Sequence, residues 1–258
     1  MWGAFQAVWA RYLRSELKAA FLRLSTLGWK IFDKGFSAPT PTVELDPETT
    51  LVAIIDPQRG FSAPSGTFGR VFGVEELGPL REAVKEMALF LNSLPKEVGV
   101  VLVLSEYPKG LHTAGITVEP LSNLCVAGDR DCDLADGLAI KDSWVVAIKH
   151  RTDAWTSPEF RAAVWRLIER GGKHLVVAGL TATTCVRESI LSILNAIDQA
   201  TITVLLIRDL IGSRASSYSS VEGEPSRVDQ AYSVMATSGA LVVPTWRCLR
   251  WRRFPIER

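Results

Sequence analysis

The chain has 258 residues, of which 47% are hydrophobic and 22% charged, and its net charge is +1. This length and apolar content suit one globular domain with a sizeable core, plus an appendage. The near-neutral charge argues against nucleic acid as a partner, because phosphate-binding surfaces normally carry a basic excess. The four cysteines form no Cys-x-x-Cys pair and no dense framework, so we expect free thiols in a reducing compartment, with the cytoplasm as the default location.

The first 42 residues differ from the rest of the chain. Aromatic and leucine side chains recur at helical spacing from Trp2 to Leu27, and six basic residues accompany two acidic ones before residue 35. A Pro/Ser/Thr-rich linker follows at 37–42. We therefore divide the chain into a basic amphipathic helical extension with its linker, residues 1–42, and a main domain, residues 43–258.

Three interpretations of this extension remain open. It is a packing or oligomerisation arm, a helix that contacts a membrane surface through residues 1–34, or a transit peptide. No stretch approaches the roughly 20 uninterrupted apolar residues of a membrane span. The mitochondrion and the membrane periphery therefore stand as alternatives to the cytoplasm.

From residue 50 onward, strand-like and helix-like segments alternate. We expect strands at 51–55, 99–104, 144–148, 175–179, 201–207 and 240–243, helices at 75–94, 158–170, 185–200 and 226–237, and a short hairpin or strand near 115–118. The strands are rich in Val, Ile and Leu and do not alternate with polar residues, which indicates burial on both faces. Alternating strands and helices predict an α/β fold with a parallel sheet covered by helices.

Three polar residues follow or close these apolar strands. Asp56 follows the first strand, Lys149 closes the third, and Cys185 lies between the fourth strand and the next helix. Ligands of open parallel sheets bind outside the carboxyl ends of the strands. A thiol in the first turn of a helix is also favoured as the thiolate by the helix dipole. An acid, an amine and a thiol at one sheet edge predict a nucleophile with its supporting charges.

Several other site patterns are missing. The sequence has no Gly-x-Gly-x-x-Gly after the first strand, no P-loop and no Gly-x-Ser-x-Gly elbow. With only three histidines, a His-rich metal site is hard to build, and His112 has no second histidine near it in the sequence. We therefore expect no metal and no cofactor.

The motifs at these strand ends resemble a known family, the isochorismatase-like cysteine hydrolases. The segment 51–61, Leu-Val-Ala-Ile-Ile-Asp-Pro-Gln-Arg-Gly-Phe, resembles the family's opening Val-Ile-Asp-x-Gln-x-x-Phe. Lys149 with Trp155 resembles a Lys followed six residues later by an aromatic residue, and 176–186 resembles the nucleophile segment. Asp209 resembles the Asp after the next strand, so the resemblance runs from about residue 51 to residue 243 in the right order.

The resemblance implies a three-layer αβα fold with a mostly parallel six-stranded sheet. It also implies a catalytic triad of Asp56, Lys149 and Cys185, in which Asp56 takes the thiol proton and Lys149 holds the carboxylate. Many members are dimers or tetramers, so a homo-oligomer is expected.

The presence of Cys185 favours hydrolysis of a C–N bond, since the ether-cleaving isochorismatases of the family lack this cysteine. The expected substrate is a small amide, ureide or carbamoyl compound, attacked to form a thioester. Nicotinamidases carry an Asp-x-His metal motif that is missing here. A non-amide hydrolase of the isochorismatase type and a non-catalytic, membrane-associated relative remain as alternatives.

The resemblance also predicts the finer parts of the site. The backbone N–H groups of Ala182 and Cys185 would form the oxyanion hole, beside a cis peptide bond at Thr181–Ala182. Ala182 itself departs from the family, which usually has Thr at this position. Phe61 and Trp155 would line the substrate pocket, with plain core packing as the alternative role.

Overall fold

The computed structural model describes residues 42–108, 121–220 and 223–252. The expected hairpin near 115–118 and His112 lie outside these ranges. Nearly all of the predicted extension at 1–42 also lies outside them. The division of the chain into an extension and a main domain therefore stays a prediction.

Six parallel strands form the central sheet in the order β4-β3-β2-β5-β6-β7. This confirms the expected mostly parallel six-stranded α/β fold. The strands are β2 (Thr50–Ile55), β3 (Gly99–Ser105), β4 (Val145–Lys149), β5 (His174–Leu180), β6 (Thr203–Gly212) and β7 (Leu241–Val243). A separate parallel pair joins β1 (Val43–Leu45) and β8 (Leu249–Trp251).

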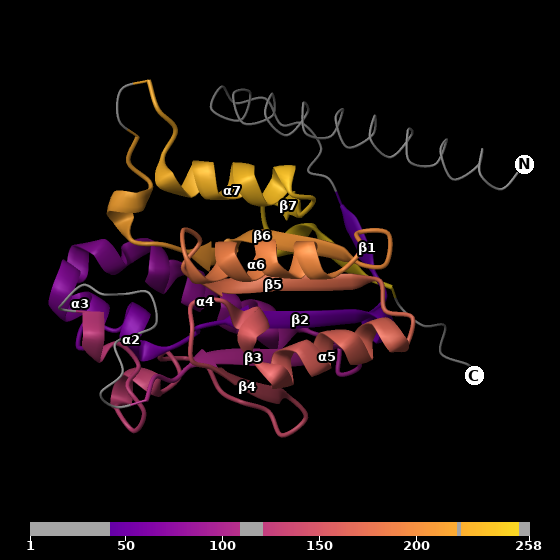
Figure 1. Ribbon diagram of the computed structural model, residues 1–258, viewed down its shortest axis with the longest axis horizontal. Coiled ribbons are helices and arrows are strands. Elements are labelled where there is room, and N and C mark those ends of the chain that lie inside the picture. Colours follow the sequence, from indigo (N-terminus) through magenta and orange to yellow (C-terminus); the bar gives the residue numbers. More distant parts are fainter. Residues whose placement is uncertain (1–41, 109–120, 221–222, 253–258) are drawn as a thin grey trace, which may run out of the picture. The chain divides into compact units, whose positions relative to one another are not determined.

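Helices cover both faces of the sheet (Figure 1). The helices are α2 (Arg59–Ser62), α3 (Thr67–Phe72), α4 (Gly78–Ser93), α5 (Pro158–Glu169), α6 (Cys185–Ala196) and α7 (Arg227–Thr237). Alternate residues of β2 serve two separate cores: Val52 and Ile54 pack with α4, whereas Ala53 and Ile55 pack with α5, α6 and α7. Because both faces are buried, every residue of β2 is buried, as its unbroken apolar run predicts.

Two boundaries differ from the sequence prediction by four residues or more. Helix α6 ends at Ala196 rather than residue 200, because Ile197 takes an extended conformation. Strand β6 continues to Gly212, five residues beyond the predicted end, with an irregularity in its pairing with β5 between Val177 and Gly179. As a result, Asp209 lies within β6, where it accepts hydrogen bonds from Thr245 and the Trp246 amide.

Candidate active site

The chain order places a topological switch point between β2 and β5. From β2 the chain moves outward to β3 and β4, then returns to β5 on the other side of β2 and continues to β6 and β7. Such a switch point opens a crevice at the carboxyl ends of the strands, where α/β proteins bind ligands. Asp56 directly follows β2, and the loop that carries Cys185 directly follows β5.

Gly179 allows β5 to approach β2 at this point. Its φ is +135°, and a Cβ atom added to it would lie 2.1 Å from the carbonyl oxygen of Ile55, the residue before Asp56. Only glycine combines this backbone conformation with this close approach. Asp56 itself has a positive φ of 52°, and its amide donates to the Val103 carbonyl at 2.8 Å.

Asp56 and Lys149 form a fully buried ion pair. The Nζ atom of Lys149 lies 3.0 Å from Oδ2 of Asp56, and neither side chain is exposed to solvent. Burial is the largest single effect and disfavours the ammonium, but the carboxylate of Asp56, with smaller contributions from Cys185 and Tyr107, outweighs it and raises the pKa of Lys149 above its usual value. Lys149 is therefore protonated at neutral pH, and its ion pair with Asp56 offsets the cost of burying the ammonium.

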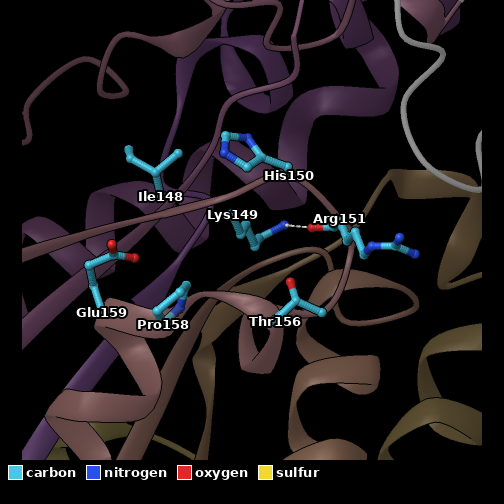
Figure 2. Close-up of a pocket in the computed structure, with 7 residues that line it drawn as sticks. All are labelled: Ile148, Lys149, His150, Arg151, Thr156, Pro158 and Glu159. Atoms are coloured by element: carbon cyan, nitrogen blue, oxygen red, sulfur yellow. Dashed lines mark hydrogen bonds between the residues drawn. The ribbon is translucent and has the colours of Figure 1, made fainter.

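Ser105, at the end of β3, connects the two charges. Its hydroxyl donates to Oδ1 of Asp56 at 2.8 Å and accepts from Nζ of Lys149 at 2.8 Å. Lys149 also donates to the carbonyl oxygen of Arg151 at 3.0 Å (Figure 2). Ser105 thus donates to Oδ1 of Asp56, whereas Oδ2 faces Lys149 in the ion pair and makes no contact with hydrogen-bond geometry to any residue that the structure describes. Oδ2 is thus available to accept a proton.

Gln58 and Tyr107 surround Ser105. The buried Gln58 amide accepts from the Ser105 amide at 2.8 Å and donates to the Ser105 carbonyl at 2.9 Å, which holds the serine backbone from both sides. The Tyr107 hydroxyl lies 3.4 Å from Ser105 Oγ, and burial raises the pKa of this phenol well above its usual value. The sequence analysis did not assign a role to Ser105, Gln58 or Tyr107, although Gln58 lies within the motif that follows β2.

Cys185 is the first residue of α6 and is only 4% exposed. Burial raises the pKa of its thiol to about 12; Lys149 lowers it in part, and the carboxylate of Asp56 raises it further. The structure therefore brings the acid, the amine and the thiol together. Burial and the negative charge of Asp56 thus oppose the thiolate that a helix N-terminus favours.

The loop between β5 and α6 corrects two predictions. The cis peptide bond joins Leu180 and Thr181, one residue earlier than expected. The Ala182 amide donates to the Gly212 carbonyl at 3.0 Å, so it is not free to bind an oxyanion. The added length of β6 supplies this carbonyl, which the sequence did not reveal. Within the described chain, the amides of Thr181, Thr183 and Cys185 donate to no backbone acceptor.

Phe61 and Trp155 occupy packed positions. Phe61 is 2% exposed and contacts Phe68 edge-on, with ring centroids 5.2 Å apart. Trp155 is partly buried and packs against Phe160 and Trp165, with centroids 6.1 and 6.3 Å away. Both contacts fit the alternative of core packing, and the role of these residues in substrate binding stays a prediction.

A pocket of about 370 Å³ lies beside Lys149, at the start of α5 (Figure 2). It is lined by Ile148, Lys149, His150, Arg151, Thr156, Pro158 and Glu159. Asp56 and Cys185 are not among these residues, so the pocket adjoins the ion pair from the side of β4 rather than the thiol.

In residues 42–108, 121–220 and 223–252, no group of three or more His, Cys, Asp and Glu side chains could hold a metal ion. Over the same ranges, no helix is both long and apolar enough to cross a membrane.

Comparison with known proteins assigns most of the chain to one protein family. A family model described as "Isochorismatase domain" matches residues 49–245. No functionally curated protein matches the sequence.

Solved structures share the fold at low sequence identity. An isochorismatase family protein from Desulfovibrio vulgaris is 20% identical, with a TM-score of 0.54 over 76% of this chain and 94% of that chain. PnC1 from L. infantum in complex with nicotinate is 15% identical, with a TM-score of 0.60 over 82% and 100%. A pyrazinamidase of Pyrococcus horikoshii in complex with zinc is 17% identical, with a TM-score of 0.56 over 76% and 98%.

Proposed function

Because the chain belongs to the isochorismatase family, we propose that it is a cysteine-dependent hydrolase that cleaves a C–N bond in a small amide, ureide or carbamoyl compound. Membership of this family supports a hydrolase activity. The observation that carries the finer proposal is the buried carboxylate of Asp56, which interacts with the protonated thiol of Cys185 and is ion-paired with Lys149.

In the proposed first step, Asp56 acts as a general base. The thiol of Cys185 is protonated at neutral pH, so its proton must leave as the sulfur attacks the substrate carbon. Oδ2 of Asp56 accepts this proton while Ser105 holds Oδ1 by its hydrogen bond and Lys149 keeps the carboxyl group in place through the ion pair. Lys149 keeps its own proton and stabilises the negative charge on the reacting groups.

The negative oxygen that forms on the substrate needs donors. We propose the backbone N–H groups of Cys185 and Thr181, which have no backbone acceptor in the described chain. Thr181 is preferred over Thr183 because it is 4% exposed and directly follows the strand end beside Asp56. One such donor contributes about 3–4 kcal/mol to transition-state stabilisation in well-studied enzymes.

The remaining steps return Asp56 to its starting state. The protonated Asp56 donates to the leaving amine as the C–N bond breaks, which leaves a thioester on Cys185. Asp56 then removes a proton from a water molecule, which attacks the thioester and releases the acid. The thiol recovers its proton from Asp56.

A screen for ammonia release tests this function. The full chain is incubated with a panel of small amides, ureas and carbamoyl compounds, together with Cys185→Ala and with Cys248→Ala as a matched control, because Cys248 is also buried, at 5% exposure, in another part of the fold. We expect turnover by the parent and by Cys248→Ala and none by Cys185→Ala. Unchanged turnover in Cys185→Ala would overturn the proposal, as would pyruvate release from isochorismate with no ammonia from any amide.

A further inference from the structure

A pair of cysteines, Cys125 and Cys132, lies in the loop between β3 and β4, apart from the thiol of the active site. Cys125 is completely buried, whereas Cys132 is partly exposed, and both are free thiols. The mechanism proposed above uses neither of them.

The two side chains point across the same turn. The Cys125 thiol donates to the carbonyl oxygen of Asp131, the residue before Cys132, at 3.4 Å. The Cys132 thiol donates to the carbonyl oxygen of Val126, the residue after Cys125, at 3.2 Å. Each sulfur thus contacts the immediate backbone neighbour of the other cysteine.

Backbone hydrogen bonds stabilise the turn between the two cysteines. The Asp129 amide donates to Val126 O at 2.9 Å, and the Cys132 amide donates to Asp129 O at 3.0 Å. Gly128, with φ of +83°, allows the chain to reverse here. The two cysteines therefore face each other across this turn, and their thiols share a side-chain hydrogen bond.

The two thiols differ in reactivity. The hydrogen bond between the two thiols raises the pKa of Cys125 and lowers the pKa of Cys132, and burial raises that of Cys125 further. Thiolate character and solvent access govern oxidation of cysteine. Cys132 has the lowered pKa and the solvent access, so we expect it to react first with the oxidant. The buried Cys125 would then react with the oxidised Cys132 to close the disulfide.

We propose that Cys125 and Cys132 form an oxidisable dithiol that a peroxide converts to an intramolecular disulfide. The Cys132 thiolate attacks one oxygen of hydrogen peroxide, the O–O bond breaks, and a sulfenic acid and water result once the proton is returned. The Cys125 sulfur then attacks the sulfenic sulfur and expels its oxygen as a second water. In total, two thiols lose two electrons and two protons, and one peroxide is reduced to two waters.

The two cysteines lie next to residues that contact Ser105 in the active site. The carbonyl of Cys132 accepts from the Gln58 side chain at 3.1 Å, and the carbonyl of Cys125 accepts from the Tyr107 amide at 2.9 Å. Gln58 and Tyr107 are the residues that surround Ser105. The proposal concerns the thiols alone and does not depend on the hydrolytic function.

The test counts and maps thiols after oxidation. The reduced full chain is treated with a small excess of hydrogen peroxide, and free thiols are counted in denaturant and located by mass spectrometry. We expect the count to fall from four to two, with Cys185 and Cys248 still free. Trypsin cuts after Arg130, between the two cysteines, so the bond joins two peptides that separate on reduction.

Matched variants and the parent chain together decide the outcome. Cys132→Ser should keep its three thiols at the same peroxide dose, whereas Cys248→Ser should lose two of three. Four persistent thiols in the parent chain would overturn the proposal, and this result does not depend on the folding of any variant. A disulfide that involves Cys185 or Cys248, or Cys132 converted to a sulfinic acid without a disulfide, would overturn it as well.

Discussion

Lys149 Nζ and Asp56 Oδ2 lie 3.0 Å apart, and neither side chain reaches solvent. Burying a charge costs free energy because the charge is removed from water, and an ion-pair partner offsets this cost. If the partner is removed, the cost remains without compensation. The pair is therefore as important for the stability of the domain as for its proposed chemistry.

We expect Lys149→Met to lower the free energy of unfolding by about 3–5 kcal/mol, because it leaves Asp56 buried and unpaired. Urea denaturation followed by circular dichroism measures the change. The double variant Asp56→Asn/Lys149→Met, which removes both charges, should lose less stability than the single variant. A loss below about 1 kcal/mol in Lys149→Met would show that the pair is not buried as described.

Ser105→Ala should reduce kcat without unfolding the protein. The variant removes the hydroxyl that bonds both Asp56 Oδ1 and Lys149 Nζ. A hydrogen bond to a charged group contributes about 1.5–3 kcal/mol, so we expect a fall of roughly 10- to 150-fold in kcat. Ser105→Thr keeps a hydroxyl and should recover part of the rate. Equal rates in the parent and Ser105→Ala would remove Ser105 from the network that positions Asp56.

Alkylation of Cys185 by iodoacetamide should be slow at neutral pH. With a pKa of about 12, the thiolate fraction, and hence the rate, should rise about tenfold per pH unit from pH 7 to pH 10. Mass spectrometry of the peptide that contains Cys185 separates its reaction from those of the other thiols. A rate that levels off below pH 9 would indicate a stabilised thiolate instead.

The same pKa predicts how stability depends on pH. An unfolded cysteine loses its proton near pH 8.5–9, whereas Cys185 in the folded chain keeps its proton until about pH 12. Between these values the folded state binds more protons, so the free energy of unfolding should fall as the pH rises through this window. Cys185→Ala should show a smaller fall than the parent in urea denaturation from pH 8 to pH 10. An equal fall in both proteins would contradict the prediction.

Gly179→Ala should disrupt the contact between β5 and β2 beside Asp56. The added Cβ would lie 2.1 Å from the backbone oxygen of Ile55, and φ would remain at +135°. We expect a loss of at least about 3 kcal/mol of stability. Gly128→Ala is a matched control, because its φ is also positive but no atom lies within 4 Å, and its cost should be about 1–2 kcal/mol. Similar costs in urea denaturation of the two variants would argue against the close approach of β5 to β2.

Local sequence patterns were enough to predict the succession of strands and helices along the chain and the reactive groups at the strand ends. Runs of Val, Ile and Leu predicted the buried strands, and their alternation with helices predicted the parallel sheet. Asp56, Lys149 and Cys185 could be singled out because the carboxyl ends of parallel strands meet at one edge. These inferences depend on local patterns and on a general rule of α/β topology.

Tertiary structure alone decided which atoms meet and how they are charged. Ser105 bonds to Asp56 and Lys149 across 49 and 44 residues of sequence, and Gln58 bonds to Cys132 across 74. The Gly212 carbonyl engages the amide of Ala182 only because β6 runs longer than its pattern predicted. Burial, which depends on the packing of the whole domain, keeps the Cys185 thiol protonated where the helix N-terminus alone favours the thiolate. Hydrogen-bond partners and solvent exclusion arise from segments distant in the chain, so no local pattern specifies them.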